Sequence, residues 1–273
     1  MEQRRGPIRK LVSAARAAVR RPDLVRNRIL GALNYWPVTR LRNERLRKVP
    51  YFCINLEKDV QRRKLAERQA RTMGLEDFRI FKGIVGVKLD IDQLIADGIY
   101  DDAAARRYHG RPLSPAEIGL SLSHANIYKT IVEEGLDEAV ILEDDVLFQP
   151  RNLDAVDWSA IPDDFDVVFL HAQLDQKPPR GRIADRIYSD ESYLASTVAY
   201  LVSRKGAEKL AKGAFPVVHA ADGLVGRAMP WHGDTPHEFR QQGVNFDLKS
   251  YILYPEGALN GSTCHFIGSS ISF

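Results

Sequence analysis

Cysteine is scarce in this chain, which contains only Cys53 and Cys264 among its 273 residues. Two cysteines cannot build a disulfide framework, and they are too few for a cysteine-based zinc site. Their scarcity excludes the small, disulfide-stabilised secreted proteins and favours a reducing compartment. The length is sufficient for one substantial α/β domain or two small ones without such cross-links.

Long apolar runs are also missing. No stretch reaches the 18 or so apolar residues that a membrane-spanning helix requires. Residues 1–10 lack the apolar core of a signal peptide. Apolar residues make up 44% and charged residues 27%, proportions that exclude a disordered or collagenous chain. We therefore expect a globular protein that stays in the cytoplasm.

Charge is divided unevenly along the chain. Residues 1–50 contain 14 Lys/Arg and 3 Asp/Glu, and the remaining residues contain 25 Lys/Arg and 33 Asp/Glu. The sequence thus predicts a basic arm, residues 1–49, on an acidic body, residues 50–273. The body carries no recognisable nucleic-acid module, so we expect no nucleic-acid partner.

The basic arm has two stretches with helical apolar spacing, separated by Pro22. Such helices can lie on a membrane, with their cations attracted to anionic lipid. The hypothesis is that the arm holds the body at the inner face of the cytoplasmic membrane, with Trp36 at the interface. The alternative is an amphipathic arm packed on its own domain. The apolar positions are Ile8, Leu11, Val12, Ala15, Ala18 and Val19 in the first stretch and Leu24, Ile29, Ala32, Leu33 and Trp36 in the second.

The body alternates short apolar runs with helical patterns, which predicts an α/β fold with a mainly parallel central sheet. Asp59 and Gly74 bracket one expected helix, and Pro115 and Gly135 bracket another. The Gly- and Ser-rich tail from residue 257 is expected to be loop. Strands are expected over residues 51–56, 78–85, 139–142, 167–170, 196–202 and 251–253, with a third helix over 205–212.

Three acids follow one of these strands directly: Glu143, Asp144 and Asp145. Ligands of open α/β sheets bind outside the carboxyl ends of the strands. If the strand continues one step, Glu143 and Asp145 share a face, where two carboxylates suit Mg²⁺ or Mn²⁺. Taken alone, the triplet is more typical of a solvated loop start than of a metal site.

A specific motif pair supports the metal-site interpretation. Residues 113–124 read LSPAEIGLSLSH, and one helix later residues 142–145 read LEDD. This combination resembles glycosyltransferase family 25, whose pattern is GEIGC-x-LSH followed by LEDD. Ala116 and Leu120 replace the family's usual Gly and Cys without removing a polar group. Further similarity at Asn55 with Arg62 and Arg63, in residues 199–207 and at Asp222 extends the resemblance over most of residues 51–273.

The resemblance implies a GT-A-type, Rossmann-like nucleotide-sugar fold in which the acids form a DxD-like motif. Asp145 would be the main metal ligand, and Glu143 or Asp144 would contact the metal or the donor ribose. Asn55, Arg62 and Arg63 would contact a UDP-sugar donor, with guanidinium groups matching its diphosphate. For the two arginines, a solvated helix face is the alternative.

Three further residues have two possible roles each. His124 either contacts the donor or is a hydrogen-bonded core histidine. Glu117 can serve the site, but a role at its helix start is favoured. Asp222 matches the family's aspartate and is the expected general base, with a helix N-cap as the alternative. His171 and Asp166 are weaker candidates for the base, and His265 could complete a metal shell.

Together these features predict a metal-dependent, inverting transferase. It would move galactose, or another hexose, from a UDP-sugar to a lipopolysaccharide-core or lipid-linked oligosaccharide. Two other classes remain open: a glycoside hydrolase with paired carboxylates, and a non-catalytic peripheral membrane protein with a relic transferase fold.

Overall fold

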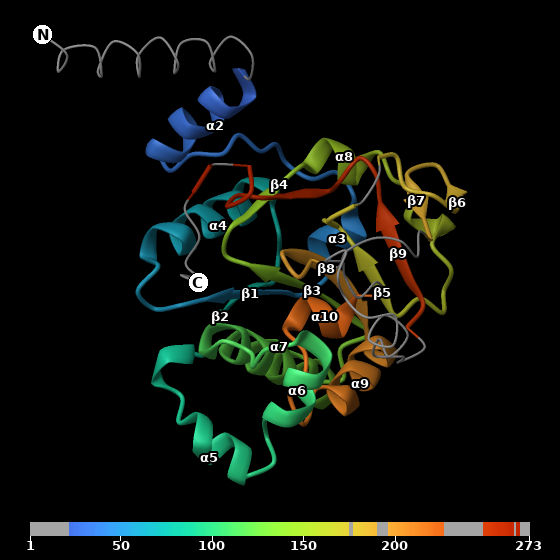
Figure 1. Cartoon of the computed structure of the whole chain (residues 1–273). Coiled ribbons are helices and arrows are strands. Elements are labelled where there is room, and N and C mark those ends of the chain that lie inside the picture. Colours follow the sequence, from blue (N-terminus) through green and yellow to red (C-terminus); the bar gives the residue numbers. More distant parts are fainter. Residues whose placement is uncertain (1–21, 175–176, 190–195, 227–247, 265, 268–273) are drawn as a thin grey trace, which may run out of the picture.

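The computed structural model describes residues 22–174, 177–189, 196–226, 248–264 and 266–267. Its centre is an eight-stranded sheet with strand order β2-β1-β3-β8-β5-β9-β7-β6 (Figure 1). The strands in that order are β2 (Phe78–Lys82), β1 (Tyr51–Asn55), β3 (Glu138–Glu143), β8 (Ala199–Ser203), β5 (Val167–Phe169), β9 (Ser250–Leu253), β7 (Ile187–Tyr188) and β6 (Arg182–Ala184).

The sheet is mixed, with most strands running in one direction. β1 pairs in parallel with both β2 and β3, and β5 pairs in parallel with β9. β8 runs antiparallel to both of its neighbours, β3 and β5, and β7 runs antiparallel to β9 and β6. The expected α/β architecture is thus present, while the mainly parallel sheet carries two reversed strands within the described residues.

The central strands are buried on both faces, which is why they read as continuous apolar runs. Alternate residues of β1 enter different cores: Tyr51 and Cys53 pack on one face, and Phe52 and Ile54 on the other. The helices α4 (Val60–Met73) and α8 (Pro150–Asp154) cover the first face. The helices α7 (Pro115–Glu133) and α9 (Arg204–Gly213) cover the second.

The two principal helices begin and end where the sequence predicts. α4 follows Asp59 and ends at Gly74, whose φ of 76° is a left-handed conformation that suits glycine. α7 begins with a capping box: the Ser114 hydroxyl accepts from the Glu117 amide, and the Glu117 carboxylate accepts from the Ser114 amide. The expected helix-start role of Glu117 is confirmed.

Several short elements have no counterpart in the expectations. The tail is not wholly loop, because β10 (Ala258–Asn260) pairs antiparallel with β4 (Val146–Phe148). This pairing was hidden by the uncharged, Gly-rich composition of the tail. The other short elements are α3 (Glu44–Lys48), η1 (Gly86–Lys88), α5 (Ile91–Ala96), α6 (Asp102–His109), η2 (Trp158–Ala160) and α10 (Ala221–Val225).

The described part of the arm packs on the body. After α2 (Pro22–Ala32), Trp36 is 6% exposed, and its indole Nε1 donates to the Phe148 carbonyl at 3.0 Å. Its ring meets Phe266 edge-on at 5.5 Å, in a cluster with Leu65 and Leu147. The expectation that Trp36 lies at a membrane interface is therefore wrong, since the indole is a core side chain.

The first amphipathic stretch of the arm, with Ile8 to Val19, lies outside the described residues. Of the helices that the structure does describe, none has the length and apolar character needed to cross a membrane.

Candidate functional site

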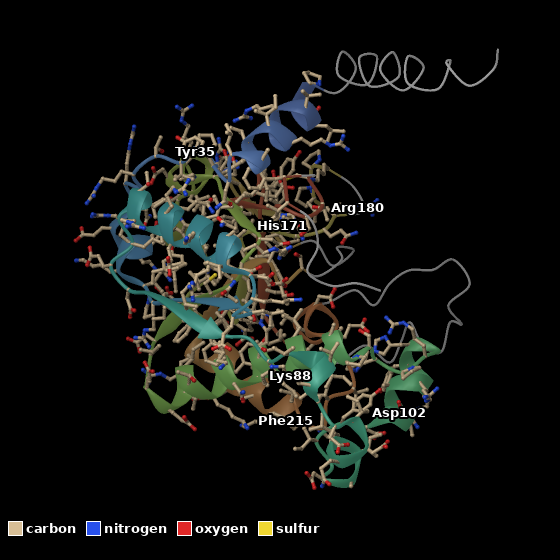
Figure 2. The ribbon with its side chains drawn as sticks, turned by 90° about the vertical axis from the view of Figure 1, so that its left-hand side faces the viewer. Tyr35, Lys88, Asp102, His171, Arg180 and Phe215 are labelled. Atoms are coloured by element: carbon tan, nitrogen blue, oxygen red, sulfur yellow. The ribbon has the colours of Figure 1, made fainter. Side chains whose placement is uncertain are left out.

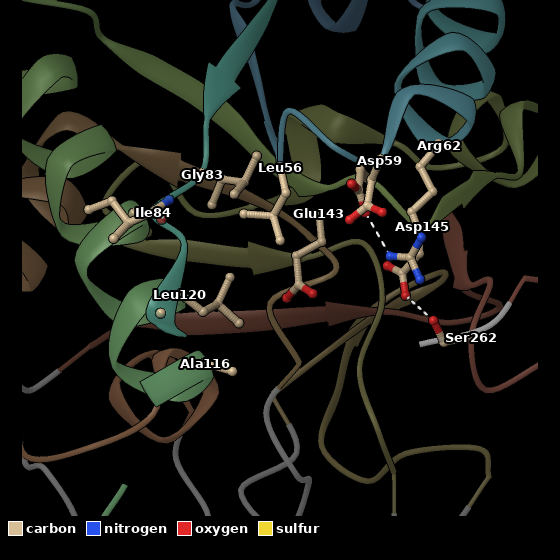
Figure 3. A pocket seen from close by; sticks show the side chains of 14 residues that line it. Leu56, Asp59, Arg62, Gly83, Ile84, Ala116, Leu120, Glu143, Asp145 and Ser262 are labelled. Carbon is tan, nitrogen blue, oxygen red and sulfur yellow. Dashed lines mark hydrogen bonds and ion pairs between the residues drawn. The ribbon is translucent and has the colours of Figure 1, made fainter. Parts of the chain in front are cut away.

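A pocket of about 120 Å³ opens at the carboxyl ends of β1 and β3, where the sequence places the acid triplet (Figure 3). Acidic and basic side chains form one part of its wall, and apolar side chains of α7 and of the loop after β2 form another. The lining residues are Ile54, Leu56, Asp59, Arg62, Gly83, Ile84, Gly86, Ala116, Leu120, Ser123, Glu143, Asp144, Asp145 and Ser262.

The apolar wall depends on a close approach between α7 and the loop after β2. A Cβ on Gly119 would lie 2.7 Å from the Ile84 carbonyl oxygen, and one on Gly86 would lie 1.9 Å from the Pro115 carbonyl oxygen. The Ser123 hydroxyl also accepts from the Ile84 amide at 2.9 Å. Glycine at both positions therefore lets the two backbones touch, which brings Ala116 and Leu120 to the pocket.

Asp144 lies at the centre of the polar wall. Its Oδ2 accepts from the Asn55 side-chain amide at 2.7 Å, and its Oδ1 forms a 2.8 Å ion pair with Arg62. Burial raises the pKa of Asp144, and the Arg62 charge and both hydrogen bonds oppose that shift. The two partners therefore offset part of the cost of burying this carboxylate, and the carboxylate in turn holds the Arg62 guanidinium at the pocket.

Glu143 is the last residue of β3, and its carboxylate faces the open part of the pocket in Figure 3. Burial raises the pKa of Glu143 well above its usual range, and the negative charges of Asp145, Asp222 and Asp144 add to the shift. A 2.5 Å hydrogen bond from Thr197 opposes it. The pocket therefore has an excess of negative charge around Glu143.

Asp145 is 6% exposed, and only one of its two carboxylate oxygens accepts a hydrogen bond. Its Oδ2 accepts from the Ser262 hydroxyl at 2.6 Å, and its backbone carbonyl accepts from the Gly261 amide at 2.8 Å. Its Oδ1 is buried and has no hydrogen-bond partner. A buried carboxylate oxygen without a donor is costly unless a cation neutralises it.

These residues fit a hard divalent cation. Oxygen ligands and excess negative charge suit Mg²⁺ or Mn²⁺, and Glu143 and Asp145 both line the pocket. Among the described residues there is no group of three or more His, Cys, Asp or Glu able to hold a metal. The two carboxylates would therefore need further ligands, such as donor phosphate oxygens or water. His265, the other expected ligand, lies outside the described residues.

The structure brings together four of the predicted site residues, Arg62, Glu143, Asp144 and Asp145, as pocket lining, with Asn55 bonded directly behind them. The strand does not continue past Glu143 as the shared-face argument assumed. Asp144 and Asp145 occupy a turn before β4, yet all three acids still reach the pocket.

Arg63 and His124 lie away from the pocket lining. Arg63 is 4.0 Å from Glu67 on an exposed part of α4, as the solvated-face alternative predicts. His124 is fully buried, its Nδ1 is 2.9 Å from the Tyr200 hydroxyl, and burial lowers its pKa to about 3. The geometry corresponds to the core-histidine alternative rather than to donor contact.

Asp222 lies in the first turn of α10, and its exposed side chain accepts from the Gly223 amide at 2.9 Å. The N-cap position belongs to Ala220, so Asp222 is not the helix cap. Asp222 is not among the pocket-lining residues, but it is near enough for its charge to raise the pKa of Glu143. Reduced hydration in turn raises the pKa of Asp222.

The two weaker base candidates have structural contacts. Asp166 is fully buried and accepts from Lys209 at 2.6 Å and from the Lys249 amide at 2.8 Å. The Nδ1 of His171 is 3.2 Å from the Ala258 carbonyl. Neither residue lines the pocket.

The sequence argument missed three polar residues of the site. Asp59 lines the pocket, whereas its sequence position predicts only a helix cap, and its side chain makes no capping bond. Asp59 follows β1 closely, and ligands of open α/β sheets bind at the carboxyl ends of strands. Its position could therefore have indicated a site residue, as it did for Glu143, Asp144 and Asp145. Thr197 and Ser262, which bond Glu143 and Asp145, carry no sequence pattern that would single them out.

The fold and the pocket define the class as an α/β protein with a pocket at the carboxyl ends of adjacent parallel strands, where open α/β sheets bind ligands. A family model described as Glycosyltransferase family 25 (LPS biosynthesis protein) matches residues 48–225. The chain therefore belongs to glycosyltransferase family 25. The matched range contains β1, α4, α7, the acid triplet and Asp222.

The chain is also similar to named relatives. Procollagen galactosyltransferase 1-B of Xenopus laevis is 34% identical over 173 residues, covering 58% of this chain and 27% of that protein. Procollagen galactosyltransferase 2 of Homo sapiens is 30% identical over 230 residues, covering 75% of this chain and 34% of that protein. A glycosyltransferase 25 family member of Aedes aegypti is 29% identical over 165 residues, covering 58% of this chain and 27% of that protein. The chain thus spans about a quarter to a third of these relatives' length.

Proposed function

We propose that this chain is a metal-dependent, inverting glycosyltransferase that moves galactose from a UDP-sugar to a saccharide acceptor. Family membership and the galactosyltransferase names of its relatives support glycosyl transfer. The observation that carries the metal-dependent form is the unpartnered, buried Oδ1 of Asp145 in a pocket shared with Glu143. Family membership favours a transferase over a hydrolase or a relic fold.

In this proposal the donor lies against the polar wall of the pocket. Arg62 faces the diphosphate, because its guanidinium is held at the wall by Asp144 and matches phosphate oxygens. Asn55 acts through Asp144, whose other oxygen it fixes. Asp145 and Glu143 would hold the divalent cation, which supplies charge neutralisation for the departing diphosphate.

Asp222 is the proposed general base. As the acceptor hydroxyl attacks the anomeric carbon, a carboxylate oxygen of Asp222 takes the hydroxyl proton, and the bond from the anomeric carbon to the diphosphate breaks. Its raised pKa suits this role, since a base whose pKa lies closer to neutrality accepts a proton more readily. The exposed position of the side chain leaves room for an acceptor.

The proposed acceptor is a lipopolysaccharide-core or lipid-linked oligosaccharide. The description of the matching family as an LPS biosynthesis protein supports this choice. A lipid-linked acceptor is confined to a membrane surface, so the proposed location is the inner face of the cytoplasmic membrane.

A thermal-shift screen of the purified chain tests the proposal. A ligand that binds only the native state raises the melting temperature. UDP-galactose with Mn²⁺ should raise it more than either alone, and UDP release should then require a saccharide acceptor. If no UDP-sugar shifts the melting temperature, the proposal fails. Metal-independent cleavage of a glycoside without nucleotide would establish the hydrolase instead.

A further inference from the structure

Of the residues that the structure describes, those that contact the helix α2 cover one of its faces and leave apolar side chains on the other exposed. On the covered face, the Asn27 side chain donates to the Cys264 carbonyl at 3.0 Å, and Leu30 packs on the cluster that contains Trp36. On the opposite face, Val25, Ile29 and Leu33 are 38%, 57% and 67% exposed. Val25 and Ile29 lie on α2 and Leu33 directly follows it, and their spacing of four positions places the three side chains in one row.

Exposed cations lie on α4, which contacts the end of α2. Asn34, after α2, donates to the Gln61 carbonyl at 3.1 Å, and Arg68 donates to the Asn34 carbonyl at 2.9 Å, so α4 lies against the end of α2. Lys64, Arg68 and Arg71 follow one another on the same side of α4 and are all exposed. Across α2 and α4 there are seven Lys/Arg and two acids.

Tyr35, shortly after α2, is a further exposed apolar side chain. Its side chain is 46% exposed, and Figure 2 shows it at the outer edge of the molecule, beside α2 and α4. We define the docking face as the apolar residues Val25, Ile29, Leu33 and Tyr35 together with the cations Arg28, Lys64, Arg68 and Arg71. Several large apolar side chains gathered on one face mark an interaction surface, whereas a single one does not.

We propose that the docking face binds an anionic phospholipid membrane. An apolar row flanked by cations is the arrangement that places side chains at the acyl boundary and charges at the headgroups. A second copy of the chain fits less well, because it would bring like charges together. Nucleic acid would use the cations but not the apolar row.

The docking face also approaches the pocket. Gln61, which contacts Asn34, directly precedes Arg62, a residue of the pocket wall. A membrane against α2 and α4 would therefore lie within the length of α4 from the pocket, about 20 Å for its 14 residues. The inference goes beyond the proposed reaction, because binding to vesicles requires no catalysis.

Vesicle flotation of the full chain tests the inference without donor or acceptor. Equimolar phosphatidylglycerol and phosphatidylcholine vesicles should carry the protein upward, whereas pure phosphatidylcholine vesicles should not. Raising the salt to 1 M should release it, because the Debye length falls to about 3 Å. Flotation that is equal on both vesicle types would overturn the proposal.

Two variants separate the apolar and charged contributions. Ile29→Asn with Leu33→Asn should weaken binding about tenfold or more, because two buried side chains are lost from the acyl boundary. Lys64→Gln with Arg71→Gln should weaken it about fivefold per charge, which corresponds to roughly 1 kcal/mol for each cation at the surface. Matched controls are Ile95→Asn on α5, 42% exposed and at the opposite end of the molecule from α2, and Lys212→Gln on α9.

The same variants distinguish a membrane from a second copy of the chain as the partner of the docking face. All four substituted residues are exposed, so the melting temperatures should stay close to that of the unaltered chain. If the apolar pair did destabilise the fold, the charge pair would still test the proposal. Unchanged flotation of both variants overturns it. So does a solution dimer that Ile29→Asn with Leu33→Asn dissociates, because the occupant would then be a second copy.

Discussion

The Ser262 hydroxyl donates a 2.6 Å hydrogen bond to one oxygen of Asp145, while the other oxygen of that carboxylate is buried without a partner. Ser262 follows β10, the tail strand that pairs with β4, so the tail orients an acid of the turn that precedes β4. This bond leaves Oδ1 as the unsatisfied oxygen at the pocket. The orientation of Asp145 is therefore set by a residue 117 positions later in the sequence.

Asp145→Asn should abolish most of the transfer and leave the fold intact. The amide keeps the shape and can still accept from Ser262, but it removes a charge that would face the cation. We expect the Mn²⁺-dependent thermal shift with UDP-galactose to disappear and turnover to fall by about 100-fold or more. Asp92→Asn, at an exposed position of α5, is the matched control. Full turnover of Asp145→Asn, or of the unaltered chain in excess EDTA, would contradict the metal proposal.

Asp222→Asn should affect the rate and spare donor binding. Loss of a positioned general base costs on the order of 10²–10⁴ in rate. Single-turnover transfer measures the rate, and the thermal shift with donor and Mn²⁺ measures donor binding. A parallel loss of rate and donor affinity would place Asp222 in the donor site and argue against its role as a base.

Glu117→Gln should make the fold less stable at neutral pH but not in acid. Although burial opposes ionisation, hydrogen bonds from Arg111 and Ser114 lower the pKa of Glu117 from 4.5 to about 2. The ionised form therefore stabilises the fold above about pH 4.5, and this contribution is lost as the pH falls toward 2. Gln retains the neutral cap, so urea unfolding should show a difference of about 2 kcal/mol at pH 7 that shrinks below pH 4.5. A difference that does not depend on pH would rule out the charge as its source.

Gly119→Ala should destabilise the chain, the reverse of the usual effect in a helix. Ala normally gains roughly 1 kcal/mol over Gly at a helical position. Here the new Cβ would lie 2.7 Å from the Ile84 carbonyl oxygen, a backbone atom that cannot move alone. We expect a loss of about 1–3 kcal/mol in the free energy of unfolding. Glu133→Ala, on an exposed part of the same helix, should be near neutral, and a stabilised Gly119→Ala would show that the contact is not tight.

The sequence predicted the acid-lined edge of the sheet because local signals suffice there. An apolar strand that runs directly into Glu143, Asp144 and Asp145 specifies both the strand and the place where its ligands lie. Helix α4 could be located from Asp59 and Gly74, and α7 from Pro115 and Gly135, because residues that start and stop helices act within a few positions.

Features that depend on tertiary partners could not be predicted in this way. Helical spacing around Trp36 predicts an apolar stripe but not whether lipid or protein covers it. The direction of β8 depends on the path of the chain and not on its own residues. Thr197 and Ser262 became site residues only through contacts over 54 and 117 positions of sequence.

Removal of the arm would also change the catalytic body, because Trp36 of the arm packs in a cluster with Leu65, Leu147 and Phe266. Trp36 bonds Phe148 and covers Leu147, which lies two residues beyond Asp145 on the other side of the turn. Truncating the chain at residue 50 would therefore uncover β4 and disturb the acids, whatever the arm does at a membrane. A deletion cannot distinguish tethering from catalysis in this protein, whereas substitutions on the docking face leave Trp36 in place and can separate the two.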